Sequence, residues 1–214
     1  MKIPKLEGAF SIEVPFIENC IGSILYNQSL VIGHRRDDLD LLRSSYFASG
    51  FMSIPEHKCI GAVFEEGLWP FRENSFDLVM LDHVFIYIDD LYRVMEQAFF
   101  SICDGGTLVV VDFLNSKRGK LAMQKHYKRA HNFSLLYIRE VLFYLGFVES
   151  YSHSFGFENN LFYNCAYQLC PSIAPLYIGV FKKKPTSVLP LPEKKQVIMP
   201  KRRGYVASIK SNLL

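Results

Sequence analysis

One stretch of the chain, residues 69–113, constrains the fold more than any other part. It opens with a turn and continues as an apolar strand over residues 76–81. After a polar bend come apolar residues at helical spacing over 91–102, a Gly-Gly pair and a second apolar strand over 107–113. Strand, helix and strand in this length indicate a right-handed crossover between two parallel strands. Because both strands are apolar along nearly their whole length, we expect a parallel sheet buried between helices.

The limits of the central helix are marked by capping residues. Asp89 and Asp90 stand where an N-cap and a first-turn acid favour a helix start. Gly105 and Gly106 predict the end of the helix, because glycine accepts the left-handed conformation that follows a C-cap. The apolar face that should contact the sheet consists of Leu91, Val94, Met95, Ala98 and Phe99.

The same patterns predict elements along the rest of the chain. A helix over 135–145 should begin after Ser134 and end at Gly146. Further helices are expected over 16–26, against the sheet edge, and over 39–47, and strands over 29–33, 62–64, 147–157 and 176–181.

Composition limits the class of protein. The 214 residues suit one domain, and half of them are hydrophobic, which excludes a disordered chain. The apolar runs are far shorter than the roughly 20 residues of a membrane span, and residues 1–10 lack the apolar core of a secretory signal. The five cysteines are odd in number and form no Cys-x-x-Cys pair, so we expect reduced thiols, a cytoplasmic protein and no metal site.

The positive charge of the chain is concentrated at its end. Residues 1–181 hold 15 Lys and Arg against 20 Asp and Glu, a net of −5, whereas residues 182–214 hold 9 against 1, a net of +8. This proline-containing segment is expected to be flexible and to lie outside the fold. Two interpretations remain open: an arm that contacts a polyanion such as RNA or DNA, or a solvated tail that aids solubility.

The central stretch resembles a known family. Trp-Pro-Phe at 69–71, Ser-Phe-Asp-Leu-Val at 75–79 and Asp-Gly-Gly at 104–106 are similar to the middle of class I S-adenosylmethionine-dependent methyltransferases of the type 11 group. The segments 81–84, 112–115 and 145–147 also resemble one poorly characterised bacterial branch of that group. The resemblance covers roughly residues 28–184.

This resemblance implies a fold and a domain division. The fold is a doubly wound α/β sheet of seven mostly parallel strands, Rossmann-like, with helices on both faces and the last strand antiparallel. Residues 1–28 become a helical lead-in, 29–184 the methyltransferase-like domain and 185–214 the tail. Asp77 is expected to hold the start of its strand to neighbouring loops by hydrogen bonds.

The resemblance also implies that S-adenosyl-L-methionine is the cofactor. In the family the first strand runs into a glycine-rich turn, which places Gly33 and His34 near the cofactor, although this chain keeps a single glycine there. Main-chain groups near Gly33 could still meet the cofactor, or the segment could be an ordinary surface turn. The acid that holds the ribose in the family is not identified in this sequence.

Further site residues follow from the same comparison. Glu65, four residues before Trp69, corresponds to the acid that reaches the adenine amino group, with Glu66 beside it; a surface turn is the alternative. Leu81 and Asp82 should flank the cofactor at the end of their strand. His83 is a candidate catalytic base, or else a hydrogen-bonded structural residue.

Two functions are compatible with these features. The first is a bacterial-type methyltransferase that acts on an unidentified acceptor, with the polar insert at 115–132 as either a substrate lid or a solvated connector. The second is a noncatalytic binding or regulatory module that kept the fold and lost the cofactor, which the reduced glycine turn and the unplaced ribose acid favour.

Overall fold

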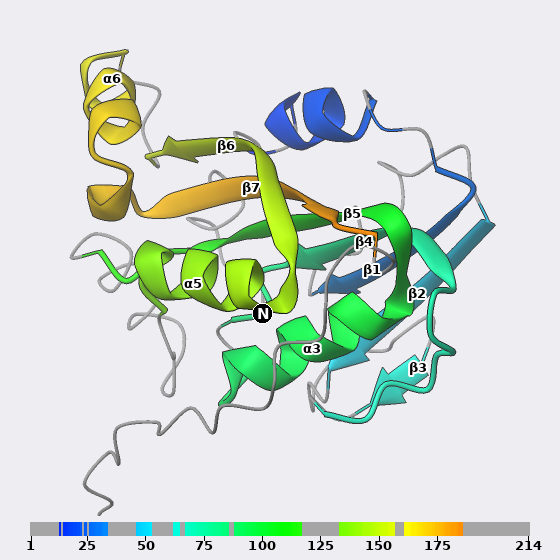
Figure 1. Ribbon diagram of the computed structural model, residues 1–214. Coiled ribbons are helices and arrows are strands. Elements are labelled where there is room, and N and C mark those ends of the chain that lie inside the picture. Colours follow the sequence, from blue (N-terminus) through cyan, green and yellow to red (C-terminus); the bar gives the residue numbers. More distant parts are fainter. Residues whose placement is uncertain are drawn as a thin grey trace, which may run out of the picture.

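A seven-stranded sheet forms the centre of the computed structural model (Figure 1). The structure describes residues 13, 15–22, 24, 26–33, 46–52, 62–64, 67–85, 88–116, 133–156 and 161–185, with side chains in all of these except 46–52, 62–64 and 161–164. The strands lie in the order β3-β2-β1-β4-β5-β7-β6. They are β1 (Gln28–Gly33), β2 (Tyr46–Met52), β3 (Ala62–Phe64), β4 (Phe76–Asp82), β5 (Ile102–Phe113), β6 (Phe147–Phe155) and β7 (Leu176–Lys183).

The direction of the strands matches the sequence prediction. Strands β1 to β5 pair in parallel, and β7 pairs antiparallel with both β5 and β6. The doubly wound α/β fold and its single antiparallel strand are therefore confirmed. The register of β5 on β7 runs from Thr107 opposite Lys182 to Phe113 opposite Leu176, so the last strand begins at the edge of the sheet where β4 and β5 end.

Helices cover both faces of the sheet. On one face α3 (Leu91–Ser101) and α5 (Leu135–Leu145) pack side by side over the central strands (Figure 1). The other face is covered by a helix over residues 15–22, whose Ile17, Cys20 and Ile21 side chains contact a core formed by β1, β4, β5 and β7. This helix therefore packs on a face of the sheet rather than on its edge.

The core explains why the central strands are apolar throughout. Leu78, Val79, Met80 and Leu81 are all fully buried, because alternate side chains of β4 enter the cores on its two faces. Burial of such a side chain contributes about 1.5–3 kcal/mol, so these residues stabilise the crossover that the sequence predicts.

The ends of the helices follow the capping prediction in three places out of four. The Asp90 carboxylate accepts hydrogen bonds from the backbone N–H groups of Tyr92 and Arg93 and starts α3. Ser134 starts α5 in the same way, and Gly146 ends it in the left-handed conformation with a φ of 96°. The prediction for the end of α3 was wrong.

Helix α3 ends at Ser101, before the two glycines. Ile102 is buried and pairs with Phe76, so it is the first residue of β5, and Gly105 and Gly106 lie in an irregular part of that strand. The carbonyls at the helix end accept hydrogen bonds from Lys183 Nζ, which lies 2.9 Å from the oxygen of Phe99 and 2.6 Å from that of Ile102. A side chain from β7 therefore replaces the local glycine cap.

Two further predictions concern the first half of the sheet. The helix expected over 39–47 was wrong at its end, because β2 begins at Tyr46; residues 39–45 lie outside the described part of the chain. The structural role of Asp77 is confirmed, since its Oδ2 atom accepts hydrogen bonds from the backbone N–H groups of Asn27 and Gln28 and joins the start of β1 to β4.

Between β6 and β7 the chain forms α6 (Leu161–Leu169) and the short helix η1 (Pro171–Ile173). Among the described residues, no helix combines the length and the apolar composition that crossing a membrane requires.

Candidate functional site

The candidate site lies where β1 and β4 end side by side. From β1 the chain moves outward to β2 and β3 and then returns to β4 on the other side of β1. In open α/β sheets, ligands bind at such a topological switch point, outside the carboxyl ends of the strands. The register places Gly33 opposite Asp82, so the last residues of the two strands are direct neighbours at this edge.

Gly33 is required by its neighbour in the sheet. A Cβ atom at this position would lie 2.5 Å from the carbonyl oxygen of Asp82 and 2.9 Å from its Cβ atom. Because the first contact is with backbone, a larger residue would push β1 and β4 apart. The glycine thus permits close approach of the two strands, which is a different reason for glycine than the cofactor contact that the resemblance implies.

A buried cluster of polar side chains follows β4. His83 Nε2 lies 3.0 Å from Glu13 Oε2 and 3.6 Å from Asp82 Oδ1, and all three side chains are excluded from solvent. Glu13 comes from the helical segment at the start of the described chain, 70 residues before His83. The cluster therefore joins the N-terminal helix to the carboxyl edge of the sheet.

The backbone and the ring of His83 are both held in place. Its N–H donates to the carbonyl oxygen of Val111 at 2.8 Å, and its φ of 53° is unusual for a residue other than glycine. The imidazole packs on the Phe113 ring, with 4.6 Å between the ring centroids. These contacts fix the direction of the imidazole relative to Glu13 and Asp82.

A third buried carboxylate ends the neighbouring strand. Asp112 Oδ2 accepts a hydrogen bond from the N–H of Phe85 at 2.7 Å, and Oδ1 accepts one from the N–H of Phe113 at 2.7 Å. Burial raises the pKa of Asp112 to about 7, while His83 and the two backbone donors act to lower it. The carboxyl edge of β4 and β5 thus carries a group that titrates near neutral pH.

The structure places four of the predicted site residues and leaves the others outside the described residues. Gly33, Asp82 and His83 come together at the switch point, whereas the Leu81 side chain is fully buried in the core next to α3. His34, Glu65 and Glu66 lie outside the described chain. Cofactor contacts by these residues stay predictions, as does a catalytic role for His83.

Glu13 and Asp112 were not predicted as site residues from the sequence. Each is a single acid in an apolar run, Ile-Glu-Val at 12–14 and Val-Val-Val-Asp-Phe at 109–113. An acid that ends a buried strand is a signal for the carboxyl edge, so Asp112 could have been found. No local pattern connects Glu13 with His83, because their contact depends on how the N-terminal helix packs.

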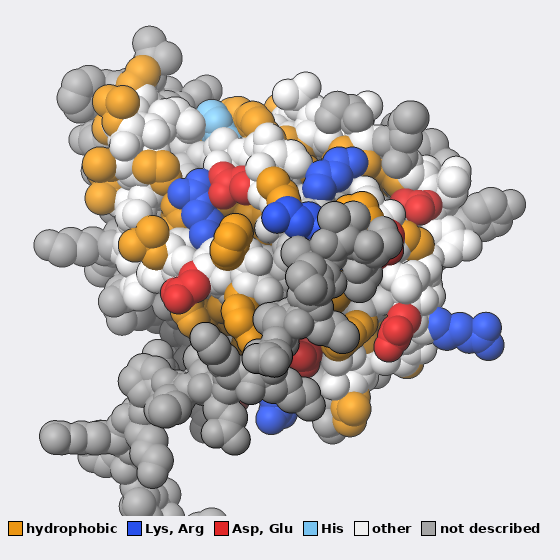
Figure 2. Space-filling view, viewed as in Figure 1, with side chains coloured by type: hydrophobic (Ala, Val, Ile, Leu, Met, Phe, Trp, Pro, Cys, Tyr) orange, Lys and Arg blue, Asp and Glu red, His pale blue; other side chains and the backbone are white. Residues whose placement is uncertain are grey.

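Two surface hollows lie at the other end of the sheet. One, of about 510 Å³, is lined by Cys20, Tyr151 and Lys182, and the second, of about 360 Å³, by Phe143, Val148 and Lys184. Lys182 pairs with Thr107, far along β5 from Phe113, so neither hollow opens onto the switch point. On the side covered by α3 and α5, apolar and charged side chains are interspersed on the surface (Figure 2).

Comparisons with known proteins agree with this architecture. A family model described as "Methyltransferase domain" matches residues 39–110, about one-third of the chain. No curated protein matches the sequence.

Solved structures share the fold at low sequence identity. An S-adenosylmethionine-dependent methyltransferase from Mesorhizobium loti has a TM-score of 0.61 at 11% identity, over 80% of this chain and 97% of that one. A methyltransferase from Archaeoglobus fulgidus has a TM-score of 0.61 at 16% identity, over 81% and 94%. The cyclase SpnF has a TM-score of 0.56 at 11% identity, over 80% and 79%.

The family match contains β2, β3, β4 and α3, which include the strand that ends at Asp82. The full sheet has the seven strands and the antiparallel β7 expected from the resemblance. The chain therefore has the fold of the class I S-adenosylmethionine-dependent methyltransferases, and residues 39–110 of it match a methyltransferase domain model.

Proposed function

We propose that the protein binds S-adenosyl-L-methionine at the switch point between β1 and β4 and transfers its methyl group to an acceptor at the same edge. The observation that carries this proposal is the pairing of Gly33 with Asp82 at the carboxyl ends of neighbouring strands in a sheet of this order. That edge is where open α/β sheets hold their ligands.

The charge at this edge fits such a cofactor. Bound S-adenosylmethionine would supply an electrophilic methyl group on a positively charged sulfonium. Asp82 ends β4 at this edge with a buried carboxylate, which favours a cation over a neutral ligand.

This proposal needs no general base. Methyl transfer to a thiol or an amine requires chiefly that the acceptor and the sulfonium are held in line. The imidazole of His83 is 2% exposed, and Glu13 contacts its Nε2 atom. We therefore assign these two residues a structural role at the carboxyl edge of the sheet. The acceptor is unidentified, and its class is left to experiment.

Calorimetry on the full-length protein with S-adenosylmethionine and S-adenosylhomocysteine tests the proposal. We expect both to bind at one site per chain. Glu65→Ala should weaken binding by roughly 1–3 kcal/mol if Glu65 accepts from the adenine amino group. Glu73→Ala, an exposed acid in the same connection, is the control and should bind as the wild type does.

The outcomes separate the two functions. Unchanged affinity in a folded Glu65→Ala variant would remove Glu65 from the site and leave the cofactor proposal intact. If the wild type binds neither compound at millimolar concentration, the methyltransferase proposal fails and a noncatalytic module replaces it. The shared fold of the cyclase SpnF illustrates that chemistry is decided by the site and not by the sheet.

A further inference from the structure

The buried cluster at the end of β4 contains three side chains that are potential metal ligands. Glu13 Oε2, Asp82 Oδ1 and His83 Nε2 all lie within 4.8 Å of one another, and their side chains are buried. One nitrogen and two carboxylate oxygens, each on a different side chain, converge on one point inside the protein. We propose that this triad binds one divalent transition-metal cation that fastens the N-terminal helix to the carboxyl edge of the sheet.

The spacing of the donor atoms supports this assignment. Ligands at roughly 2.0–2.2 Å from a metal lie about 2.8–3.6 Å apart in octahedral or tetrahedral geometry. The His83 nitrogen is 3.0 Å from the Glu13 oxygen and 3.6 Å from the Asp82 oxygen. All three donor atoms lie within 4.8 Å of one another, a separation that side-chain rotations could close around one ion.

The charges of the ligands also suit a divalent ion. Two carboxylates in a buried position are costly to desolvate, and an ion with two positive charges matches them while the imidazole binds in its neutral form. Mixed nitrogen and oxygen ligation suits Zn²⁺, Mn²⁺ or Fe²⁺, whereas Mg²⁺ and Ca²⁺ prefer oxygen ligands alone.

The imidazole is oriented as a metal ligand needs to be. The hydrogen bond from the His83 N–H to Val111 and the packing of the ring on Phe113 restrict both the backbone and the ring. Ligating histidines are commonly held by a hydrogen bond from their other ring nitrogen, and here the backbone bond and the ring packing restrict the residue instead. The site is thus organised before an ion binds, apart from the position of Glu13.

The role of the ion would be to hold the N-terminal helix in place. Asp82 and His83 belong to one short segment after β4, and only Glu13 comes from elsewhere in the chain. A bound ion therefore links two segments 70 residues apart in sequence. We expect the melting temperature of the full-length protein to rise when the ion binds.

Metal titration of chelator-treated, full-length protein tests the inference. Calorimetry with Zn²⁺ and with Mn²⁺ should show one equivalent bound, and Mg²⁺ should bind at least tenfold more weakly. Glu13→Gln keeps the size of the side chain and removes its charge, so it should weaken binding at least tenfold and abolish the rise in melting temperature. Glu18→Gln changes an exposed acid on the same helix and should leave both unchanged.

A second measurement uses no variant. Anomalous diffraction from crystals grown with Zn²⁺ should place the ion among Glu13, Asp82 and His83. An ion found elsewhere, no binding by the wild type, or equal binding by the wild type and Glu13→Gln would each overturn the inference. The titrations contain no S-adenosylmethionine, so they do not depend on the proposed function.

Discussion

Asp112 is an acidic residue in a buried position among apolar side chains. It ends a strand of apolar residues, is fully buried, and uses both oxygens to accept backbone hydrogen bonds. Those bonds order the turn after β4 through Phe85 and the end of β5 through Phe113. The same burial disfavours the carboxylate charge and raises the pKa to about 7.

The raised pKa predicts how stability depends on pH. Between its unfolded value of 3.8 and the folded value of about 7, Asp112 is protonated in the folded chain and ionised in the unfolded chain. Stability therefore decreases as pH rises through this window and is constant with respect to this group above it. Asp112→Asn removes the titration, so the variant should gain up to about 4 kcal/mol relative to the wild type between pH 4 and pH 7.5.

Urea unfolding with chelator present, at several pH values, measures this gain. The amide can accept only one of the two backbone bonds, which adds a penalty that does not vary with pH. Glu140→Gln, at an exposed position on α5, should run parallel to the wild type. A parallel curve for Asp112→Asn as well would show that Asp112 does not titrate in this window.

Gly33 gives a prediction based on contact alone. Gly33→Ala places a Cβ atom 2.5 Å from the carbonyl oxygen of Asp82, so β1 and β4 must separate. We expect a loss of about 1–3 kcal/mol in the free energy of unfolding, with or without cofactor. Gly22→Ala, where no atom lies within 4 Å of the new Cβ, should not destabilise the protein. Equal stability of the Gly33 variant and the wild type would contradict the close approach of the strands.

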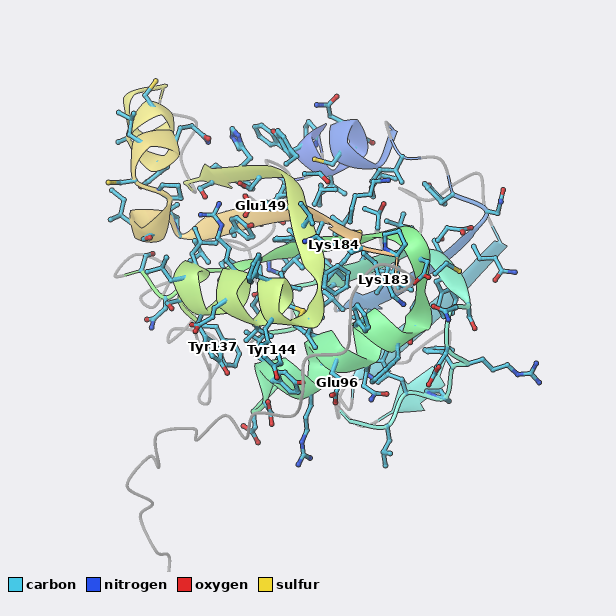
Figure 3. The ribbon with its side chains drawn as sticks, in the orientation of Figure 1. Glu96, Tyr137, Tyr144, Glu149, Lys183 and Lys184 are labelled. Atoms are coloured by element: carbon cyan, nitrogen blue, oxygen red, sulfur yellow. The ribbon has the colours of Figure 1, made fainter. Side chains whose placement is uncertain are left out.

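At the scale of elements, the clearest interaction is the one between β7 and α3. The ammonium of Lys183 donates to Asn74 Oδ1 at 3.0 Å as well as to the carbonyls of Phe99 and Ile102, and it lies 4.4 Å from the centroid of the Phe99 ring. Figure 3 shows Lys183 at the end of β7, near the point where α3 passes into β5. Burial lowers the pKa of this lysine, because it removes water from the ammonium. The hydrogen bonds to Asn74, Phe99 and Ile102 take the place of that water.

Lys183→Met tests this cap. Methionine keeps much of the apolar stem but donates no hydrogen bonds, which leaves buried carbonyls without their donor. The expected loss is about 2–3 kcal/mol in the free energy of unfolding by urea. Lys182→Met, one residue earlier and exposed, should change stability by less than about 0.5 kcal/mol. Similar transition midpoints for the two variants would show that the cap does not stabilise α3.

The same elements indicate how far sequence alone could predict the structure. Strand β4 and residues 107–113 of β5 were predictable because they are largely apolar, and α5 because Ser134 and Gly146 mark its ends. Strand β2, with the sequence YFASGFM, mixes small and polar residues and has no strand periodicity, so the helix prediction was extended into it. The end of α3 and the contact of Glu13 with His83 depend on residues about 80 and 70 positions away, which no local pattern reveals.

At the scale of the whole molecule, part of the positive charge that the sequence places in the C-terminal tail belongs to the folded domain. Of the nine basic residues in 182–214, Lys182 and Lys183 belong to β7 and Lys184 follows it directly. Residues 185–214 therefore hold 6 basic residues against 1 acid, a net of +5, and most of this segment lies outside the described chain. Contact with a polyanion through it stays a proposal.

Removal of that segment tests the proposal. A chain that ends at Lys184 keeps every described strand, so its melting temperature should equal that of the full-length protein. If the segment is an electrostatic arm, the shortened chain should bind heparin or RNA more weakly at low salt, and the difference should vanish as salt is raised. Equal binding by both chains would exclude the arm, and a large fall in melting temperature would move the domain boundary into the tail.

The position of β7 between β5 and β6 has a consequence for how the protein is made. Of the described strands, this one is the last to leave the ribosome, yet both of its neighbours precede it in the sequence. Until it emerges, the nascent chain holds β6 without a pairing partner, β5 with an open edge and α3 without the ammonium at its end. Completion of the sheet must then wait for synthesis to pass residue 183, and exposed strand edges before that moment are the segments that a chaperone would need to protect.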